Sequence, residues 1–327
     1  MTVDVKQSQR GGRPRLLRYR DDWQILDRFG ILFSFLLLVI ISSIASPRFL
    51  SPANIGNIIL QISLVGIIAI GMTFVILTAG IDLSVGSTLA LVGVLTAGIV
   101  TSHGMVAGIA AGLAAGTIVG VVNGLGVTLG RVQPFVMTLG MLGIARGLAF
   151  LYTGGEPIPV NDETFLNIGT GYLFGLPITS VIFLVLLVGA ALVLRYTAFG
   201  RYVFAIGSND EAARLSGVHV GMYKLAVYTV VGLLTGVAGV LYASQLAVGT
   251  PVAGDGYELD AIAAVVVGGT SLFGGEGGMV GTLLGAATIG VLANILNLTN
   301  VSPFVQQLAK GVLIILAVMI KARARRR

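Results

Sequence analysis

Two acidic residues interrupt long apolar runs in this chain of 327 residues, and both lie beside glycines. Asp82 is found in "GIDLSVGSTL" and Glu276 in "GGEGGMVGTL". A carboxylate at the centre of a bilayer costs on the order of 3 kcal/mol, so such a residue is a candidate for ion coupling or gating. It can instead cap a helix, because the exposed N–H groups at a helix start stabilise a negative charge. The residues of interest in these two turns are Asp82, Ser84, Gly86, Gly275 and Glu276.

Two basic residues also fall inside apolar runs. Lys310 lies about seven residues into the last run, close enough to an end for its stem to snorkel, or it pairs with an interior carboxylate. Arg146 lies mid-way along another run and has no local partner. His103 and His219 fall at the ends of runs or in loops, where an interfacial or loop position is the simplest interpretation.

The residue inventory excludes several chemistries. The chain has no Cys, so disulfides and thiolate metal sites are excluded, and its two His are too far apart in sequence to suggest a metal site. No Gly-Lys pair occurs, so the phosphate-binding loop G-x-x-x-x-G-K-[ST] is missing. We therefore predict no cofactor and no nucleotide hydrolysis by this chain.

Composition indicates a polytopic membrane protein of the all-α class. Hydrophobic residues make up 55% of the chain and charged residues 10%, against about 25% charged in a typical soluble domain. The net charge of +6 is concentrated at the two ends, which argues against nucleic acid as a partner. Basic flanks predict that both termini are cytoplasmic. We divide the chain into a basic segment (1–28), a membrane domain (29–320) and a basic tail (321–327).

Apolar runs of bilayer length predict a helical bundle of about ten spans, since one crossing takes roughly 20 apolar residues. Two cytoplasmic ends require an even number. Two regions, 58–102 and 258–298, could each hide half-helices. The longest cytoplasmic loop is then 195–223. The ten candidates are 29–46, 58–80, 84–102, 105–129, 132–153, 174–194, 224–248, 258–273, 277–298 and 304–320.

Glycines recur every four residues along the fourth predicted span. Each four-residue step overshoots one helical turn by about 40°, so the ridge rotates around the helix. One straight neighbour cannot follow it, and we expect either two closely packed helices or a steep crossing. The ridge comprises Gly104, Gly108, Gly112, Gly116, Gly120 and Gly124.

The long cytoplasmic loop contains a short helix signal, "AIGSNDEAARLSGVHVG". Ser208 followed by Glu211 forms a capping box, and Gly217 supplies a left-handed stop. We predict a helix of about two turns from Asn209 to Ser216. So short a helix is unstable alone, so it must dock, either on a groove of a partner protein or within its own loop. Its other residues are Asp210, Ala212, Ala213 and Arg214.

These residues carry a resemblance to a known family. Glu211-Ala212-Ala213-x-x-x-Gly217 resembles the loop by which membrane subunits of binding-protein-dependent ABC importers contact their ATPase, although no Ile-x-Leu-Pro follows Gly217. "GIDLSVGS" (80–87) and "VVVGGTSLFGGEGG" (265–278) are more specific, and they resemble permeases of the ribose-type sugar importers. The resemblance covers residues 29–320.

The resemblance implies a division of labour in the inner membrane. Two copies of the permease form the path, separate ATP-binding subunits drive it, and an extracytoplasmic binding protein delivers a monosaccharide. The turns at Asp82 and Glu276 are then expected at the inner mouth, and the acidic outer loops 154–173 and 249–260 at the binding protein. Two alternatives stay open: an ion-coupled secondary transporter using Asp82 and Glu276, and a membrane scaffold without transport.

Overall fold

The computed structural model describes residues 15–325, so parts of the two basic end segments, residues 1–14 and 326–327, lie outside the described residues. Within the described part the chain is almost entirely helical. Helix α1 begins at Arg15, so the second half of the basic segment 1–28 continues directly into the first apolar run. Helix α13 likewise continues into the basic tail as far as Arg325.

Thirteen helices make up the described residues. Their bounds are α1 Arg15–Ala45, α2 Pro52–Leu77, α3 Val85–His103, α4 Met105–Thr128, α5 Pro134–Thr153, α6 Glu163–Thr170, α7 Ile178–Tyr196, α8 Ala198–Ser208, α9 Asp210–Leu215, α10 Val220–Leu246, α11 Tyr257–Val267, α12 Met279–Leu298 and α13 Pro303–Arg325. Two antiparallel pairs of short strands complete the fold: β1 (Ile158–Pro159) with β4 (Val248–Gly249), and β2 (Tyr172–Leu173) with β3 (Leu176–Pro177).

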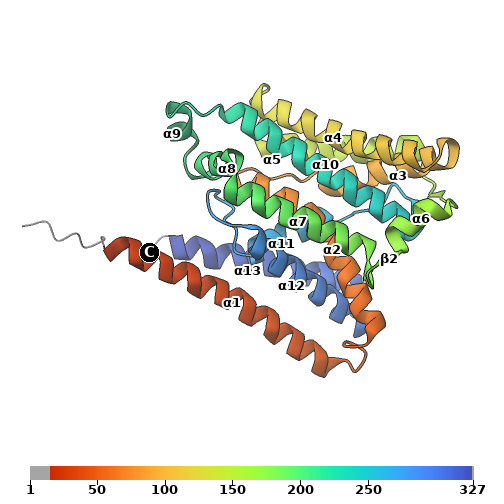
Figure 1. Cartoon of the computed structure of the whole chain (residues 1–327), viewed down its shortest axis with the longest axis horizontal. Coiled ribbons are helices and arrows are strands. Elements are labelled where there is room, and N and C mark those ends of the chain that lie inside the picture. The colour runs from red at the N-terminus through yellow and green to blue at the C-terminus, as the bar shows by residue number, and fades with distance from the viewer. Residues whose placement is uncertain (1–14, 326–327) are drawn as a thin grey trace, which may run out of the picture.

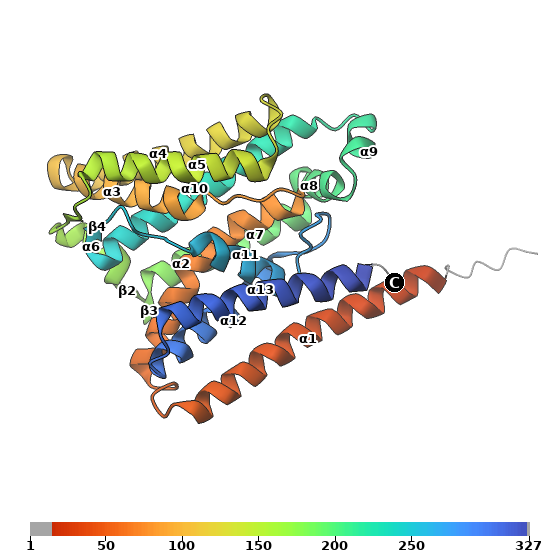
Figure 2. The same cartoon turned by 180° about the vertical axis from the view of Figure 1, so that it is seen from behind.

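The long helices lie roughly along one direction, so the molecule has two distinct ends (Figures 1 and 2). At one end lie α8, α9, the start of α1 and the end of α13, and at the other end lie α6 and the short strands. Helix α10 packs against α4, α3 and α2, while α12 packs against α2, α11 and α1. Helix α2 thus joins the two groups, and it is buried on all sides from Gly66 to Leu77.

Helix α2 starts at a point that the sequence specifies well. Ser51 is its N-cap, and the Ser51 side chain accepts a hydrogen bond from the backbone N–H of Asn54 at 3.4 Å. Pro52 occupies the first helical position, where its missing N–H costs nothing. The core of the helix is made of fully buried aliphatic side chains, among them Ile67, Ile68 and Met72.

Seven helices of the described residues are long and apolar enough to cross a membrane, and residues 30–45 of α1 form a shorter apolar helix. This confirms the all-α, polytopic class. It does not confirm that each of the ten expected spans is one long helix, and the expected span 258–273 does not form a helix that crosses the whole bilayer. The helix there, α11, has only 11 residues, and at 1.5 Å per residue it covers about 16 Å, half of a bilayer core of about 30 Å.

The glycine ridge of α4 faces two neighbours in turn. A Cβ atom on Gly108 would overlap residues of α3, whereas one on Gly116 or Gly120 would overlap the backbone of α10 near Gly232. Gly112 lies at the changeover, close to Thr96 of α3 and to a valine of α10. The rotation of a four-residue repeat around the helix therefore places two helices, rather than one, in close contact with α4.

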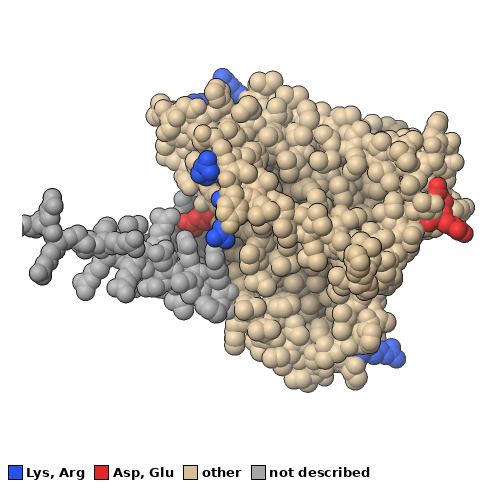
Figure 3. Space-filling view, in the orientation of Figure 1, with Lys and Arg blue, Asp and Glu red and all other residues tan. Residues whose placement is uncertain are grey.

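Charged side chains divide between the two ends of the molecule. Most of the basic side chains visible in Figure 3 lie at the end formed by α8 and α9, where an acidic side chain is also seen, and acidic side chains lie over α6 at the opposite end. The acidic loop residues Glu156 and Glu163 are exposed there, as expected for the loop 154–173. The expected outer surface 249–260 is different: Asp260 is 7% exposed, and the chain of this segment runs into the fold.

Candidate functional site

The segment 208–217 forms a short, well-terminated helix at the basic end. Asn209, not Ser208, is the N-cap of α9: the Asn209 side-chain oxygen accepts the N–H of Ala212 at 2.9 Å. Ser208 ends the preceding helix α8 and donates its hydroxyl to the carbonyl of Phe204. The expected capping box is therefore wrong by one residue, because Ser208 is already committed to the hydrogen bonds of α8.

The C-terminal end of α9 follows the prediction. Gly217 has a φ of +85°, the left-handed conformation that glycine adopts without penalty. Its N–H donates to the carbonyl of Arg214, and the N–H of Val218 donates to that of Ala213. This pair of bonds is the Schellman arrangement that ends a helix.

One face of α9 docks on its own chain and the other is open. Ala213 is buried against Ile206 and Val220, so the helix is held onto α8 and α10. Asp210 forms an ion pair with Lys224 at 2.6 Å and a longer one with Arg214 at 3.7 Å. The open face carries Glu211, Ala212, Arg214, and a leucine, Leu215, that is 81% exposed.

Asp82 lies inside the fold, not on its rim. It is 2% exposed and follows α2 on an irregular stretch, residues 78–84, that leads back to the start of α3. Its carboxyl group accepts the backbone N–H of Ser84 at 2.8 Å and the Ser84 hydroxyl at 2.6 Å. Asn123 of α4 donates to the Ser84 hydroxyl at 2.9 Å and, at 3.4 Å, to Asp82 itself. These bonds organise the turn before α3. They do not cap the helix itself, because Ser84 is the N-cap of α3 and no side-chain cap hydrogen bond is formed there.

A close backbone contact lies next to Asp82. Gly86, in the first turn of α3, leaves no room for a Cβ, because it would overlap the carbonyl oxygen of Gly254 and the carboxylate of Glu258. The start of α3 therefore touches the start of α11. Arg146 holds the same segment from α5, donating to the carbonyls of Pro251 at 2.5 Å and Ala253 at 2.8 Å. The partners of Arg146 come from a distant part of the sequence.

The Glu276 turn is a surface turn made by backbone. Glu276 is exposed. Helix α12 begins at Met279 with Gly278 as its N-cap, and no side chain caps this helix. The N–H of Gly275 donates to the carbonyl of Leu77, the last residue of α2, at 3.0 Å. A Cβ on Gly207 of α8 would overlap that same carbonyl. Three segments therefore meet at one point beside α9: the end of α2, the end of α8 and the turn before α12.

Lys310 has a structural partner, and the two histidines lie at the surface. Lys310 of α13 pairs with the buried Asp260 of α11 at 2.8 Å, so it pairs with an interior carboxylate rather than snorkelling. His103 and His219 are both exposed at helix ends, His103 in contact with Ser102. Within residues 15–325 no group of three or more His, Cys, Asp or Glu residues lies together as a metal site would require.

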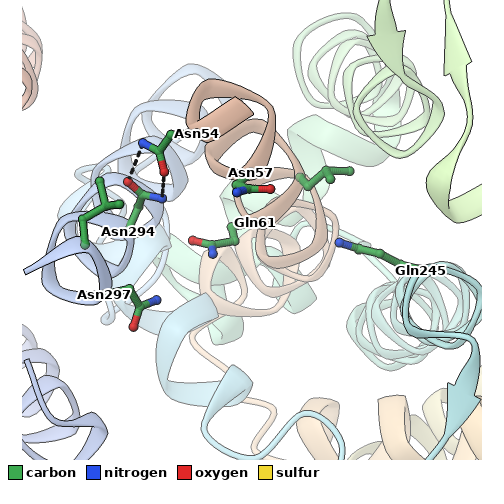
Figure 4. Close-up of a pocket in the computed structure, with 8 residues that line it drawn as sticks. Asn54, Asn57, Gln61, Gln245, Asn294 and Asn297 are labelled. Carbon is green, nitrogen blue, oxygen red and sulfur yellow. Dashed lines mark hydrogen bonds between the residues drawn. The ribbon is translucent and has the colours of Figure 1, made fainter. Parts of the chain in front are cut away.

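A polar cavity of about 280 Å³ lies at the opposite end of the molecule, between α2, α10 and α12 (Figure 4). Its lining side chains include six carboxamides and no charged group, so the charged residues that stand out in the sequence do not point to it. The signal was present: α2 repeats amides at positions i, i+3 and i+7, and α12 at i and i+3, on otherwise apolar helices. The six are Asn54, Asn57, Gln61, Gln245, Asn294 and Asn297.

Comparison with known proteins gives a consistent picture. Residues 54–318 match the family described as "Branched-chain amino acid transport system / permease component". The chain is 47% identical over 299 residues to the ribose import permease protein of Bacillus subtilis, covering 90% of this chain and 93% of that protein. It is 46% identical to the ribose import permease of Escherichia coli K12 (88% and 92% covered) and 39% to an L-arabinose permease of Azospirillum brasilense (91% and 88%). No solved structure matches the chain.

Proposed function

Because the chain belongs to this family of transport-system permease components, we propose that it is the membrane-spanning subunit of an ABC importer for a monosaccharide, ribose or a similar pentose or hexose. The family description names branched-chain amino acids, but the relatives that match nine-tenths of the chain are named for ribose and L-arabinose. The chain itself performs no catalysis in this proposal. ATP is hydrolysed by a separate subunit.

The proposed topology has ten crossings with both termini in the cytoplasm. Two crossings combine a helix with non-helical chain: residues 78–84 lead back from the end of α2 to α3, and residues 247–256 lead in from the other end to α11. The path of the ribbon supports this, since α1 starts and α13 ends at the same end of the molecule (Figures 1 and 2). The basic side chains near α8 and α9 support a cytoplasmic position for that end.

The observation that carries the proposal is the exposed face of α9. A six-residue helix has little stability of its own, yet here it is capped at both ends, anchored by Ala213 and left with Leu215 and Arg214 facing outward. A short, fixed helix that exposes one apolar and one basic side chain suits a groove on an ATP-binding subunit. The acidic surface over α6 at the opposite end suits the delivery of sugar by an extracytoplasmic binding protein.

The structure offers a route from α9 to the membrane core. Helix α10 begins three residues after Gly217, and α8 ends beside the carbonyl of Leu77, where the turn before α12 also attaches. A displacement of α9 is therefore passed to α10, α2 and α12. We propose that closure of the ATPase pair moves these helices and that two copies of the chain rock between outward and inward openings. Apolar side chains that stay exposed on α4, α5 and α7 are available to contact a second copy and lipid.

The test is co-purification from native membranes in mild detergent, with ATPase activity assayed on the eluate. We expect an ATPase to accompany the wild-type chain and to be lost with Arg214→Glu, which reverses a charge on a side chain that is 64% exposed. Arg195→Glu, on an exposed arginine at the end of α7, is the matched control and should retain the ATPase. An ATPase absent from all three samples would favour the ion-coupled alternative instead.

A backbone variant separates the shape of α9 from its charge. Gly217→Val forces a β-branched residue into the left-handed region, at a cost of about 1–2 kcal/mol, although no atom would clash with the new side chain. We expect loss of sugar uptake with normal insertion. Gly217→Asn is the control, because asparagine tolerates this conformation. Full uptake by Gly217→Val would show that the end of α9 does not transmit motion.

A further inference from the structure

The polar cavity at the end opposite α9 has room for a small solute. Its volume of about 280 Å³ equals that of roughly nine water molecules at about 30 Å³ each. Figure 4 shows Asn57 and Gln61 from α2 on one side and Gln245 from α10 on the other, with the Asn54–Asn294 pair and Asn297 along the wall of α2 and α12. Leu60 and Leu298 complete the lining.

Half of these carboxamides already have structural partners. Asn54 and Asn294 exchange two hydrogen bonds, of 3.0 and 2.8 Å, which fasten α2 to α12. The oxygen of Asn297 accepts a bond from Gln306 of α13 at 2.8 Å. The other three, Asn57, Gln61 and Gln245, are thus the candidates for contact with a solute.

Two of the candidates are under-satisfied. The side-chain oxygens of Gln61 and Gln245 are buried and have no hydrogen-bond partner among residues 15–325. Leaving a buried polar atom unpaired is unfavourable, so an amide in an apolar helix is expected to serve a ligand or water. Each carboxamide can turn about its last side-chain bond and offer either its oxygen or its NH₂ group. A sugar hydroxyl can pair with both, because it donates and accepts.

The chemistry of the lining discriminates between solutes. No charged side chain lines the cavity, so a zwitterionic amino acid would leave both its ammonium and its carboxylate without a counter-charge. A neutral sugar needs only hydrogen bonds. The cavity also lies between α2, α10 and α12. The opposite end of α2 meets the end of α8 and the turn before α12, and α10 begins shortly after α9, so movement of α9 would change the shape of the cavity.

We propose that Asn57, Gln61 and Gln245 form a sugar-contacting site at the extracytoplasmic end of the transport path, where a neutral monosaccharide leaves its binding protein. The inference rests on the proposed function and adds the residues that the sugar meets. The site is a transient one. Three neutral side chains give weak hydrogen bonds, which lets the sugar leave again when the helices move.

The first test measures initial rates of labelled ribose uptake in cells that contain this chain, its ATPase and its binding protein but no other ribose permease. Gln61→Leu and Gln245→Leu keep the size of the side chain and remove its hydrogen bonds. We expect maximal uptake to fall about tenfold or more with the KM for ribose unchanged, because the separate binding protein sets the KM. Gln133→Leu, on an exposed glutamine before α5, is the matched control.

The outcomes separate this inference from the proposed function. If the wild-type chain takes up neither ribose nor arabinose, or takes up leucine instead, the proposed function fails. If wild type transports ribose and both variants match it, the sugar-contacting site is overturned while the function stands. A reduced rate counts for the site only if binding-protein-stimulated ATPase activity is retained, since that readout reports an assembled transporter.

A second test does not depend on the leucine variants folding. The chain has no cysteine, so Asn57→Cys gives it a single thiol. We expect a bulky membrane-impermeant thiol reagent, added outside intact cells, to label this thiol and block ribose uptake. Gln133→Cys should be neither labelled nor inhibited under the same conditions. Failure to label Asn57→Cys, or labelling without inhibition, would overturn the site.

Discussion

The turns at Asp82 and Glu276 both place an acidic residue among glycines, but the first acid is buried and the second is exposed. Asp82 is 2% exposed and bonded to Ser84 and Asn123, whereas Glu276 is exposed and its turn is held by backbone. In the first turn the acid makes the contacts. In the second, Gly275 makes the contact, through its N–H to Leu77.

The difference shows that distant elements decide the role of a local pattern. Asp82 is buried because α4 brings Asn123 over it and Gly254 closes on the neighbouring Gly86. No described helix covers Glu276 in this way, and the carboxylate stays at the surface. Asp82 therefore belongs to the architecture of the fold, whereas Glu276 is a surface group.

The largest effect is expected from Asp82→Leu. The substitution leaves the N–H and the hydroxyl proton of Ser84 without the acceptor that they share, and two buried unpaired donors cost about 2–6 kcal/mol together. We expect a lower midpoint of thermal unfolding in detergent and little protein in the membrane. An unchanged midpoint would show that the hydrogen bonds around Asp82 do not hold the start of α3.

Much of the fold was predictable because hydropathy reports burial in lipid. Each of the ten apolar runs contains a helix, and the ridge of α4 predicts its two neighbours. Hydropathy does not distinguish helix from irregular chain, so the sequence left open that 58–102 and 258–298 each hide half-helices and did not place the short helix α11 or the irregular stretch before α3. The family motifs could be read locally. The spacing of the amides on α2 and α12 could also be read locally, but the cavity could not, because only the fold brings these two helices together with Gln245 of α10.

A smaller effect is expected from Asp82→Asn, which sharpens the comparison by removing only the charge. The asparagine oxygen can still accept the N–H and hydroxyl of Ser84, and the weaker 3.4 Å bond from Asn123 is lost. We expect a loss of about 1 kcal/mol in the free energy of unfolding and ribose uptake within about twofold of wild type. Abolished uptake by a protein of normal stability would instead indicate that the charge of Asp82 takes part in transport, as in an ion-coupled carrier.

The smallest effect is expected from Glu276→Gln. An exposed substitution away from any cap or ion pair changes stability by no more than about 0.5 kcal/mol, so the unfolding midpoint should be that of wild type. Ribose uptake is then the informative measurement. Unchanged uptake would limit the function of this turn to its glycine backbone, which joins α2 to α12. A fall in uptake at constant stability would show that the carboxylate touches a partner, because nothing within the described chain would have been lost.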